Sequence, residues 1–359
     1  MKQKLRVGII GLGGICRCAH MPAYEKMENV EVAAICDILP EKIESFRQLF
    51  PKVEAPAFTD NKELLQVEGL DYVDICTPNY LHSVIAVDAL HAGLHVFTEK
   101  PDAVSVEEAL KMKQAAEETG KHLMVMRNNR YRPSSQFLKK YIEQGKMGEI
   151  YCGRCGWIRR RGIPGKGGWF TTKEQSGGGP LIDLGVHMID LSIWLMGNPT
   201  PVAVSGCTYR KFADSDVSDS VHSSFGEKKS DGIFDVEDLA MGFIRFDNGA
   251  CLQIEFSWAS NIEQEEAFVE LRGTKSGSKF SSKYDGIHIF TEENGQCVDL
   301  LPTVLDSTGT DHHEANLRHF ADVLLQDKEP DFVPEQGVNM IRILQAMYRS
   351  AELGKEVTL

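Results

Sequence analysis

Residues 5–16 of the chain read LRVGIIGLGGIC, a short apolar run followed by closely spaced glycines. The run has the length and composition of a buried strand, and Cys16 stands where a third glycine would complete the pattern G-x-G-x-x-G. In a strand–turn–helix unit, Gly11 permits the tight turn, and Gly13 lets the backbone approach a pyrophosphate at the helix N-terminus. Cys16 is small enough for helix and strand to pack closely. The stretch predicts a dinucleotide-binding turn.

An acidic residue ends the next predicted strand. Asp37 closes the sequence AAICD. A carboxylate at this place accepts hydrogen bonds from a ribose diol and repels a 2′-phosphate, which favours NAD over NADP. The alternative is a tight turn in some other doubly wound fold.

Strand-like and helical segments alternate through the first third of the chain. The expected strands are 5–10, 30–36, 72–76, 95–98 and 122–126, and the expected helices are 39–50, 83–92 and 106–119. This alternation predicts βαβ units that form a doubly wound parallel sheet with helices on both faces. We assign residues 1–126 to this NAD(P)-binding domain.

The pattern changes near residue 149. Longer strands are expected at 150–158, 202–209, 239–246, 250–258, 267–272 and 286–290, and helices at 314–326 and 335–353. Asp247-Asn248-Gly249 is a strong hairpin signal. Residues 127–359 are therefore predicted to form an α+β domain with a large, mostly antiparallel sheet, with its last helix able to pack back toward the first domain. The loops 159–179 and 211–235 are either mobile segments or covers of an active site.

Length, charge and cysteine content narrow the class of protein. The chain has 359 residues, enough for two domains that each bury a core, and its net charge of −13 argues against nucleic acid or an anionic membrane as partner. No apolar run reaches the length of a transmembrane helix. Nine scattered cysteines are typical of reduced thiols in a cytoplasmic protein.

Two peptides close predicted parallel strands, where open sheets bind ligands. They are Cys76-Thr77-Pro78-Asn79 and Thr98-Glu99-Lys100-Pro101. A lysine at such a strand end can donate to a developing alkoxide and to a nicotinamide ribose. The alternative for Lys100 is an ordinary surface lysine before a turn proline.

An apolar helix with ionisable residues is predicted over 181–196, after the glycines at 177–179 and Pro180. Asp183, His187 and Asp190 follow at i, i+4 and i+7, so they lie on one face. Because burying unpaired charge is costly, this stripe indicates a cleft. A solvated stripe on an amphipathic helix is the alternative.

The motifs GLGGIC, AICD, TPNYLH, TEKP and GGGPLIDLGVHMIDLSIWLMG, with MYRSAELGKEV near the end, occur in this order over nearly the whole chain. With them the sequence resembles the Gfo/Idh/MocA oxidoreductase family, which includes glucose–fructose oxidoreductase and inositol dehydrogenase. The resemblance implies a Rossmann domain joined to a domain with an open-faced sheet, and a homodimer or homotetramer built through that sheet. It also implies NAD-dependent oxidation of a secondary hydroxyl of a sugar, sugar derivative or cyclitol.

Lys100, Asp183 and His187 match the acid–base residues of the inositol-dehydrogenase-type site. The resemblance implies that His187 takes the alcohol proton, that Asp183 orients His187 and the substrate, and that Lys100 positions the reacting oxygen. Asp190 is then expected to hold a further hydroxyl. A histidine tuned by an adjacent carboxylate suits this proton transfer near neutral pH.

Further contacts are expected around these residues. Trp169, in a loop that begins with three arginines, is expected to stack on a sugar or nicotinamide, whereas the arginines themselves are interpreted as a solvated turn. Arg127 is either a ligand contact or part of an interdomain salt bridge. The expected cofactor contacts are Gly11, Leu12, Gly13, Gly14, Ile15, Asp37, Thr77, Pro78, Asn79, His82, Glu99, Lys100 and Arg127. The expected substrate contacts are Lys100, Trp169, Asp183, His187 and Asp190.

No metal site is expected. Cys152 and Cys155 have CxxC spacing, but residues three apart on a strand point to opposite faces. The histidines at 312, 313 and 319 are interpreted as solvated or as the rim of a substrate cleft, with metal binding as the less favoured alternative. Two functional alternatives stay open: an NAD-assisted enzyme that cleaves glycosides through transient oxidation, and a non-catalytic NAD-binding sensor.

Overall fold

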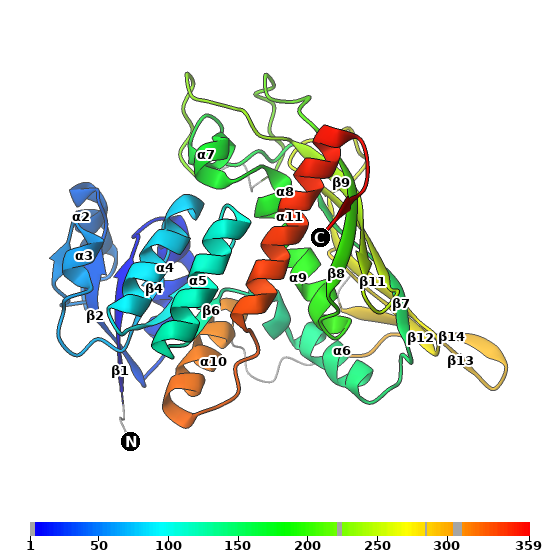
Figure 1. The fold of residues 1–359 in the computed structure, drawn as a ribbon, viewed down its shortest axis with the longest axis horizontal. Helices are drawn as coiled ribbons and strands as arrows, with labels where there is room; N and C mark the ends of the chain where they lie inside the picture. The colour runs from blue at the N-terminus through cyan, green and yellow to red at the C-terminus, as the bar shows by residue number, and fades with distance from the viewer. Residues whose placement is uncertain (1–3, 221–224, 284–285, 304–310) are drawn as a thin grey trace. The chain divides into compact units, whose positions relative to one another are not determined.

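The computed structural model describes residues 4–220, 225–283, 286–303 and 311–359. The chain divides into two compact units. The first comprises residues 1–128 and 310–341, and the second comprises residues 129–309 and 342–359. Figure 1 follows the chain from blue at the N-terminus to red at the C-terminus.

The described strands of the first unit form one six-stranded sheet in the order β3-β2-β1-β4-β5-β6. They are β1 (Leu5–Ile10), β2 (Val30–Cys36), β3 (Ala57–Phe58), β4 (Tyr72–Ile75), β5 (His95–Thr98) and β6 (Leu123–Val125). All neighbouring pairs are parallel, which confirms the predicted doubly wound sheet. The strand order reverses between β1 and β4, so their carboxyl ends mark the edge where such sheets bind ligands.

Helices cover this sheet, and one of them comes from the C-terminal part of the chain. The helical segments are η1 (Cys16–His20), α1 (Met21–Tyr24), α2 (Pro40–Leu49), α3 (Asn61–Leu64), η2 (Asn79–Leu81), α4 (His82–His91), α5 (Val106–Thr119) and α10 (His312–Gln326), and η3 (Asn128–Tyr131) crosses the unit boundary. Figure 1 shows α4 and α5 side by side, and they are in contact. Helix α10 places Phe320 against Tyr72 and Phe97, with ring centroids 5.3 Å apart in both pairs. This aromatic packing explains why α10 belongs to the first unit.

The second unit is built on a nine-stranded sheet in the order β14-β13-β12-β11-β7-β10-β9-β8-β15 among the described residues. The strands are β7 (Ile150–Ile158), β8 (Pro201–Tyr209), β9 (Leu239–Phe246), β10 (Cys251–Ser257), β11 (Glu266–Gly273), β12 (Ser276–Ser281), β13 (Ile287–Glu293), β14 (Gln296–Leu300) and β15 (Val357–Thr358). Apart from the parallel β7–β10 pair, neighbouring strands are antiparallel. The predicted hairpin between β9 and β10 is confirmed, and Gly249 has a φ of 84° there.

Helix α9 packs against β7, β10 and β11 of this sheet. The helical segments of this part of the chain are α6 (Pro133–Glu143), η4 (Trp169–Thr171), α7 (Lys173–Ser176), α8 (Pro180–Asp183) and α9 (Gly185–Leu195), and α11 (Pro334–Leu353) crosses the unit boundary. The single helix predicted over 181–196 is therefore wrong, because the helix is interrupted at Leu184. Glycine is a weak helix former, and Gly185 directly follows the break.

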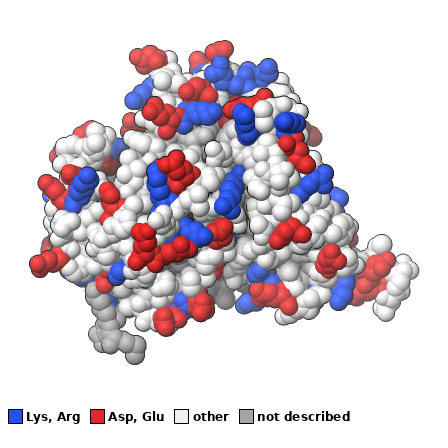
Figure 2. Space-filling model, viewed as in Figure 1, with Lys and Arg blue, Asp and Glu red and all other residues white. Residues whose placement is uncertain are grey.

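None of the described helices is both long and apolar enough to span a bilayer. On the face shown in Figure 2, basic and acidic side chains are interspersed. All nine cysteines are free thiols.

Candidate active site

The glycine-rich turn follows β1 and has room for a ligand on one side. Gly11 has a φ of 95°, and a Cβ there would lie 2.7 Å from the carbonyl group of Cys76. Only glycine fits this position without displacing the backbone. A Cβ on Gly13, in contrast, would meet none of the described protein atoms within 4 Å. The turn is therefore tight against β4 and open at Gly13, as a pyrophosphate site requires.

Asp37 holds this turn. Its Oδ2 accepts a hydrogen bond from the backbone N–H of Leu12 at 2.8 Å, and its Oδ1 accepts one from Leu39 at 3.0 Å. A carboxylate offers about four acceptor positions, so these bonds leave capacity for ribose hydroxyls. The residues present fit a dinucleotide at this strand end.

The peptide after β4 presents a polar group to the same edge. The hydroxyl oxygen of Thr77 is buried and makes no hydrogen bond to the part of the chain that the structure describes. The imidazole of His82 contacts the carbonyl oxygens of Thr77 and Pro101, both at 2.8 Å, and so joins the two strand-end peptides. Among the other expected cofactor contacts, Leu12 and Asn79 are buried, Ile15 and Pro78 are half-buried, and Gly14 is exposed.

Lys100 follows β5 and is held through its backbone. Its N–H donates to Oε2 of Glu99 at 3.0 Å. The other oxygen of Glu99 contacts Nε2 of His20 at 2.9 Å, and Nδ1 of His20 contacts Asp74 at 2.7 Å. His20 and Asp74 were not predicted from the sequence. The available signals were an ionisable residue at the start of an otherwise apolar helical stretch and an aspartate within a buried strand.

Arg127 forms an ion pair inside the first unit. Its Nη2 lies 2.6 Å from Oδ2 of Asp102, both side chains are buried, and the guanidinium lies 5.1 Å from the ring centroid of Phe332. The salt bridge considered for Arg127 is thus internal to the first unit and not an interdomain contact.

In the second unit, Asp183 and His187 are the two half-buried residues between Leu181 and Asp190, and the others are all buried. This pattern rules out a solvated stripe. Oδ2 of Asp183 accepts a hydrogen bond from the indole N–H of Trp258 at 3.0 Å. The His187 ring lies beside Trp157, with centroids 6.1 Å apart. The two ionisable side chains are therefore partly accessible, and each lies beside a tryptophan, Trp258 or Trp157.

Asp190 differs from the other two members of the predicted stripe. Arg130 donates to both of its oxygens, from Nε at 2.8 Å and from Nη2 at 2.6 Å. The two residues are 5% and 1% exposed. A bidentate ion pair explains the burial of the Asp190 charge without a bound ligand.

Arg159 is buried, so its interpretation as part of a solvated turn is wrong. It is 5% exposed, and its guanidinium lies 5.2 Å from the ring centroid of Trp157. Its Nη1 donates to the carbonyl of Gly162, whereas its buried Nε has no hydrogen-bond partner among the described residues. Burial lowers the pKa of Arg159, and the nearby Asp183 opposes this shift. The cation thus adds to the electrostatic field at Asp183.

The loops 159–179 and 211–235 are joined by hydrogen bonds. Thr171 Oγ1 donates to the carbonyl of Ile233 at 2.7 Å, and the N–H of Lys229 donates to Lys166. Trp169 is half-buried and stacks on Phe170. Residues of both loops line a cavity of about 1040 Å³.

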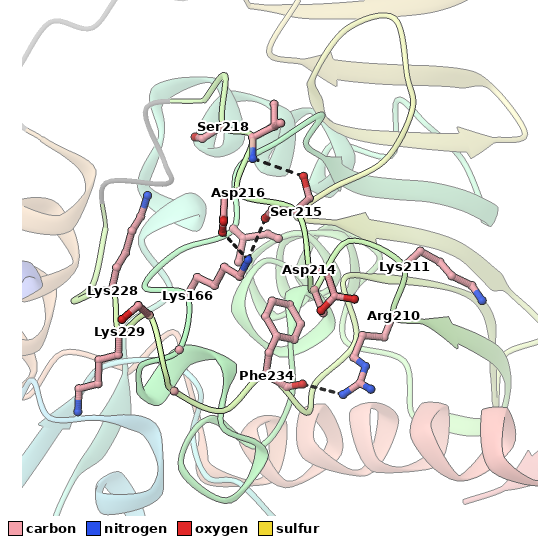
Figure 3. A pocket seen from close by; sticks show the side chains of 16 residues that line it. Lys166, Arg210, Lys211, Asp214, Ser215, Asp216, Ser218, Lys228, Lys229 and Phe234 are labelled. Atoms are coloured by element: carbon pink, nitrogen blue, oxygen red, sulfur yellow. Dashed lines mark hydrogen bonds and ion pairs between the residues drawn. The ribbon is translucent and has the colours of Figure 1, made fainter.

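Two of the cations that line this cavity, Lys166 and Arg210, have protein partners. Figure 3 shows Lys166 directed at Asp216 and Ser215, and Arg210 directed at the carbonyl of Phe234. The side chain of Lys211 points away from them. The cavity is therefore a hollow of mixed charge.

Two groups of described side chains have donor atoms close enough for one ion: His20 with Asp74 and Cys76, and Asp311 with His312 and His313. In the first group, the carboxylate contacts of His20 account for the clustering without an ion. Nε2 of His313 contacts Asn128.

Two family models together cover most of the chain. Residues 5–127 match the NAD-binding Rossmann fold of the oxidoreductase family, and residues 139–359 match its C-terminal alpha/beta domain. The D-glucoside 3-dehydrogenase of Escherichia coli is 32% identical over 99% of this chain and 97% of its own length. A scyllo-inositol 2-dehydrogenase (NADP(+)) of Bacillus subtilis is 26% identical over 99% of this chain and 96% of its own.

A solved structure of levoglucosan dehydrogenase in complex with NADH is similar over the whole fold. It is 25% identical in sequence and has a TM-score of 0.85. The match covers 99% of this chain and 99% of that one. The family models, the relatives and the fold agree with the motifs in the glycine turn and the Asp183–His187 helix. The chain belongs to the Gfo/Idh/MocA oxidoreductase family.

Proposed function

We propose that the protein is an NAD-dependent dehydrogenase that oxidises a secondary hydroxyl of a sugar or glycoside, with His187 as proton acceptor. The observation that carries this proposal is the Asp183–His187 pair, half-buried on an otherwise buried helical stretch. Similarity to a D-glucoside 3-dehydrogenase over 99% of the chain supports a glucoside-like substrate. Asp37 supports NAD as the cofactor, because its carboxylate disfavours a 2′-phosphate.

In the proposed reaction the bound nicotinamide supplies the hydride acceptor. Gly13, Asp37 and Thr77 would hold the dinucleotide. His187 takes the hydroxyl proton, and Asp183, fixed by Trp258, stabilises the imidazolium that forms. Lys100 donates to the substrate oxygen as negative charge develops on it.

Arg159 contributes to the same chemistry from the second unit. Its buried cation favours negative charge near Asp183, and its Nε can donate to a substrate oxygen. A neutral side chain in this place would lose both effects.

A spectrophotometric screen tests the function. Purified protein is mixed with NAD or NADP and with alkyl glucosides, anhydrosugars, inositols or free aldoses, and formation of reduced nicotinamide is followed. Reduction of NAD by a glycoside is the expected result. Tightly bound NAD with glycoside cleavage and no net NADH would favour the redox-assisted glycosidase. Binding without turnover on any substrate would favour the sensor.

Cofactor choice and assembly have separate tests. Asp37→Ser is expected to lower kcat/KM for NAD more than for NADP, and an unchanged ratio would contradict the assignment of Asp37. We also propose a homodimer or homotetramer through the nine-stranded sheet. Light scattering on the purified protein distinguishes these assemblies from a monomer.

A further inference from the structure

A buried network of ionisable groups lies beside the proposed cofactor edge of the first unit. His20, at the end of η1, is 0% exposed. Its Nδ1 is 2.7 Å from Asp74 of β4, and its Nε2 is 2.9 Å from Glu99, which follows β5. Tyr24 donates a hydrogen bond to the same oxygen of Asp74 at 2.9 Å. The network thus joins the helix after the glycine turn to two central strands.

With both carboxylates ionised, this geometry requires His20 to be a cation. A neutral imidazole has one N–H, so one of the two carboxylates would face a lone pair. Burial alone would lower the pKa of His20, but Asp74 and Glu99 together raise it well above its usual value. Burial alone would raise the pKa of Glu99, yet the hydrogen bond and charge of His20 lower it to about 2. Glu99 therefore stays ionised although it is buried.

Glu99 transmits this arrangement to Lys100. Its second oxygen accepts the backbone N–H of Lys100 at 3.0 Å. A protonated Glu99 would be a weaker acceptor for this N–H, because bonds to charged acceptors are about twice as strong as neutral ones. The charge on His20 is thereby connected to the position of Lys100.

We propose that His20 is a positioning residue of this oxidoreductase: as a buried cation between Asp74 and Glu99, it keeps the Glu99 carboxylate ionised and bonded to the backbone of Lys100. The role in catalysis rests on the proposed function of Lys100. His20 touches neither reacting atom, and it acts through Glu99.

Other ionisable groups surround the network and belong in any test of pH dependence. Lys100 and His313 add positive charge that lowers the pKa of Glu99, and His82 senses the charge of Glu99. The remaining groups near His20 are Tyr24, Tyr72, Cys16, Cys18 and Cys76. Burial raises the pKa of Tyr24, Tyr72 and Cys76, so these groups stay neutral over the pH range in which activity would be measured.

His20→Gln tests the proposal because it keeps a hydrogen-bond donor and removes the charge. Glu99 then stays buried without its main cation and is expected to take up a proton within the working pH range. The kcat of the variant should fall about tenfold, the equivalent of one charged hydrogen bond, and should acquire an acid limb that the wild type lacks. His91→Gln, on the exposed end of α4, is the matched control and should change nothing.

Infrared spectroscopy gives a readout that needs neither cofactor nor substrate. On acid titration, the substrate-free His20→Gln protein should show the carbonyl band of a protonated buried carboxyl. Asp74 loses the same cation, so the double variant His20→Gln/Glu99→Gln should lack only the part of this band that Glu99 contributes, and it should also lack the acid limb of kcat. If no substrate supports turnover, the titration still tests whether His20 keeps Glu99 ionised. Failure of the proposed function can therefore be distinguished from failure of the proposal for His20.

A uniform loss of kcat with an unchanged pH profile and no carboxyl band would overturn the proposal and leave His20 a structural role. If His20→Gln does not fold, as judged by circular dichroism, Asp74→Asn replaces it. Removing one of the two anions lowers the pKa of His20, so kcat of Asp74→Asn should be lost at a lower alkaline pH than in the wild type. An unshifted alkaline limb would contradict the proposal.

Discussion

Each compact unit buries one glutamate beside the segment that carries its proposed proton-transfer residues, and the two are held by different chemistry. Glu99 precedes Lys100 and faces the His20 cation. Glu237 accepts hydrogen bonds from the backbone N–H groups of Gly179 and Leu181, at 3.0 and 3.1 Å, where the helical segment leading to Asp183 begins.

The two surroundings have opposite effects on ionisation. Glu237 has neutral donors, including Tyr348 at 2.9 Å, and its burial raises its pKa although these bonds work against the shift. The pKa of Glu99, equally buried, is lowered to about 2. Hydrogen bonds from neutral groups thus fix the position of a carboxylate, whereas a buried cation also fixes its charge.

Both glutamates lie beside segments that carry proposed proton-transfer residues. Removing the proposed proton acceptor itself should therefore have the largest effect on kcat. His187→Asn is expected to reduce kcat by about 10² to 10⁴, as for loss of a general base. NAD affinity should stay unchanged, because no cofactor contact is assigned to His187. Steady-state kinetics and a fluorescence titration check both points. Full turnover in this variant would remove His187 from the mechanism.

Stability should distinguish the two glutamates directly. Glu99→Gln leaves the buried His20 cation without one of its anions and is expected to cost about 3–5 kcal/mol. Glu237→Gln leaves one backbone N–H facing an amide donor and should cost about 1–3 kcal/mol. Urea unfolding of both variants measures the difference. Equal losses would mean that the His20 charge does not set the energetics of Glu99.

The pH dependence of stability in the same variants follows from the direction in which the pKa of each glutamate is shifted. The folded pKa of Glu99 is depressed, so its contribution is present above its unfolded value and is lost as the pH falls toward about 2. Ionisation of Glu237 opposes folding, because its folded pKa is raised. The stability gap between wild type and Glu99→Gln should therefore shrink in acid below about pH 4. A gap that is constant down to about pH 2 would contradict this account.

Asp190 of α9 resembles Glu99 because it too is a buried carboxylate paired with a cation, here Arg130. Asp190→Asn should lower the free energy of unfolding by about 3–5 kcal/mol through loss of the pair with Arg130. If the role of Asp190 is structural, the KM for the sugar stays unchanged. A tenfold rise in KM with wild-type stability would instead favour the hydroxyl contact that the family resemblance implies.

The smallest expected effect concerns the donor to Asp183. Trp258→Phe keeps the buried ring and removes the indole N–H, and kcat should fall about tenfold, in line with one hydrogen bond to a charged group. A second variant, Trp157→Phe, alters the tryptophan ring that lies beside His187 and serves as the comparison for a change in ring packing. Equal losses in both variants would show that ring packing, and not the hydrogen bond, matters.

Short-range signals in the sequence predicted much of this structure. The glycine turn, Asp37 at a strand end and the hairpin at 247–249 are each specified by a few adjacent residues. The helix break at Leu184 was missed because apolar periodicity continues through it, and the weak propensity of Gly185 was outweighed in the sequence pattern.

Pairings between distant residues could not be predicted. Asp74 and Glu99 lie 54 and 79 positions from His20, and Arg130 lies 60 positions from Asp190. The local sequence does not specify which of several buried ionisable side chains will contact one another in the fold. The stripe of Asp183, His187 and Asp190 was therefore predicted as one set, although the structure separates Asp190 from the other two.

The proposed function requires Lys100 and His187 to act on the same proton transfer. Single-turnover NADH formation by Lys100→Met, His187→Asn and the double variant tests it most directly. Residues that act as a unit are strongly non-additive. The double variant should therefore be no more than about threefold slower than the slower single variant. A double variant as slow as the product of both single losses would contradict a shared role.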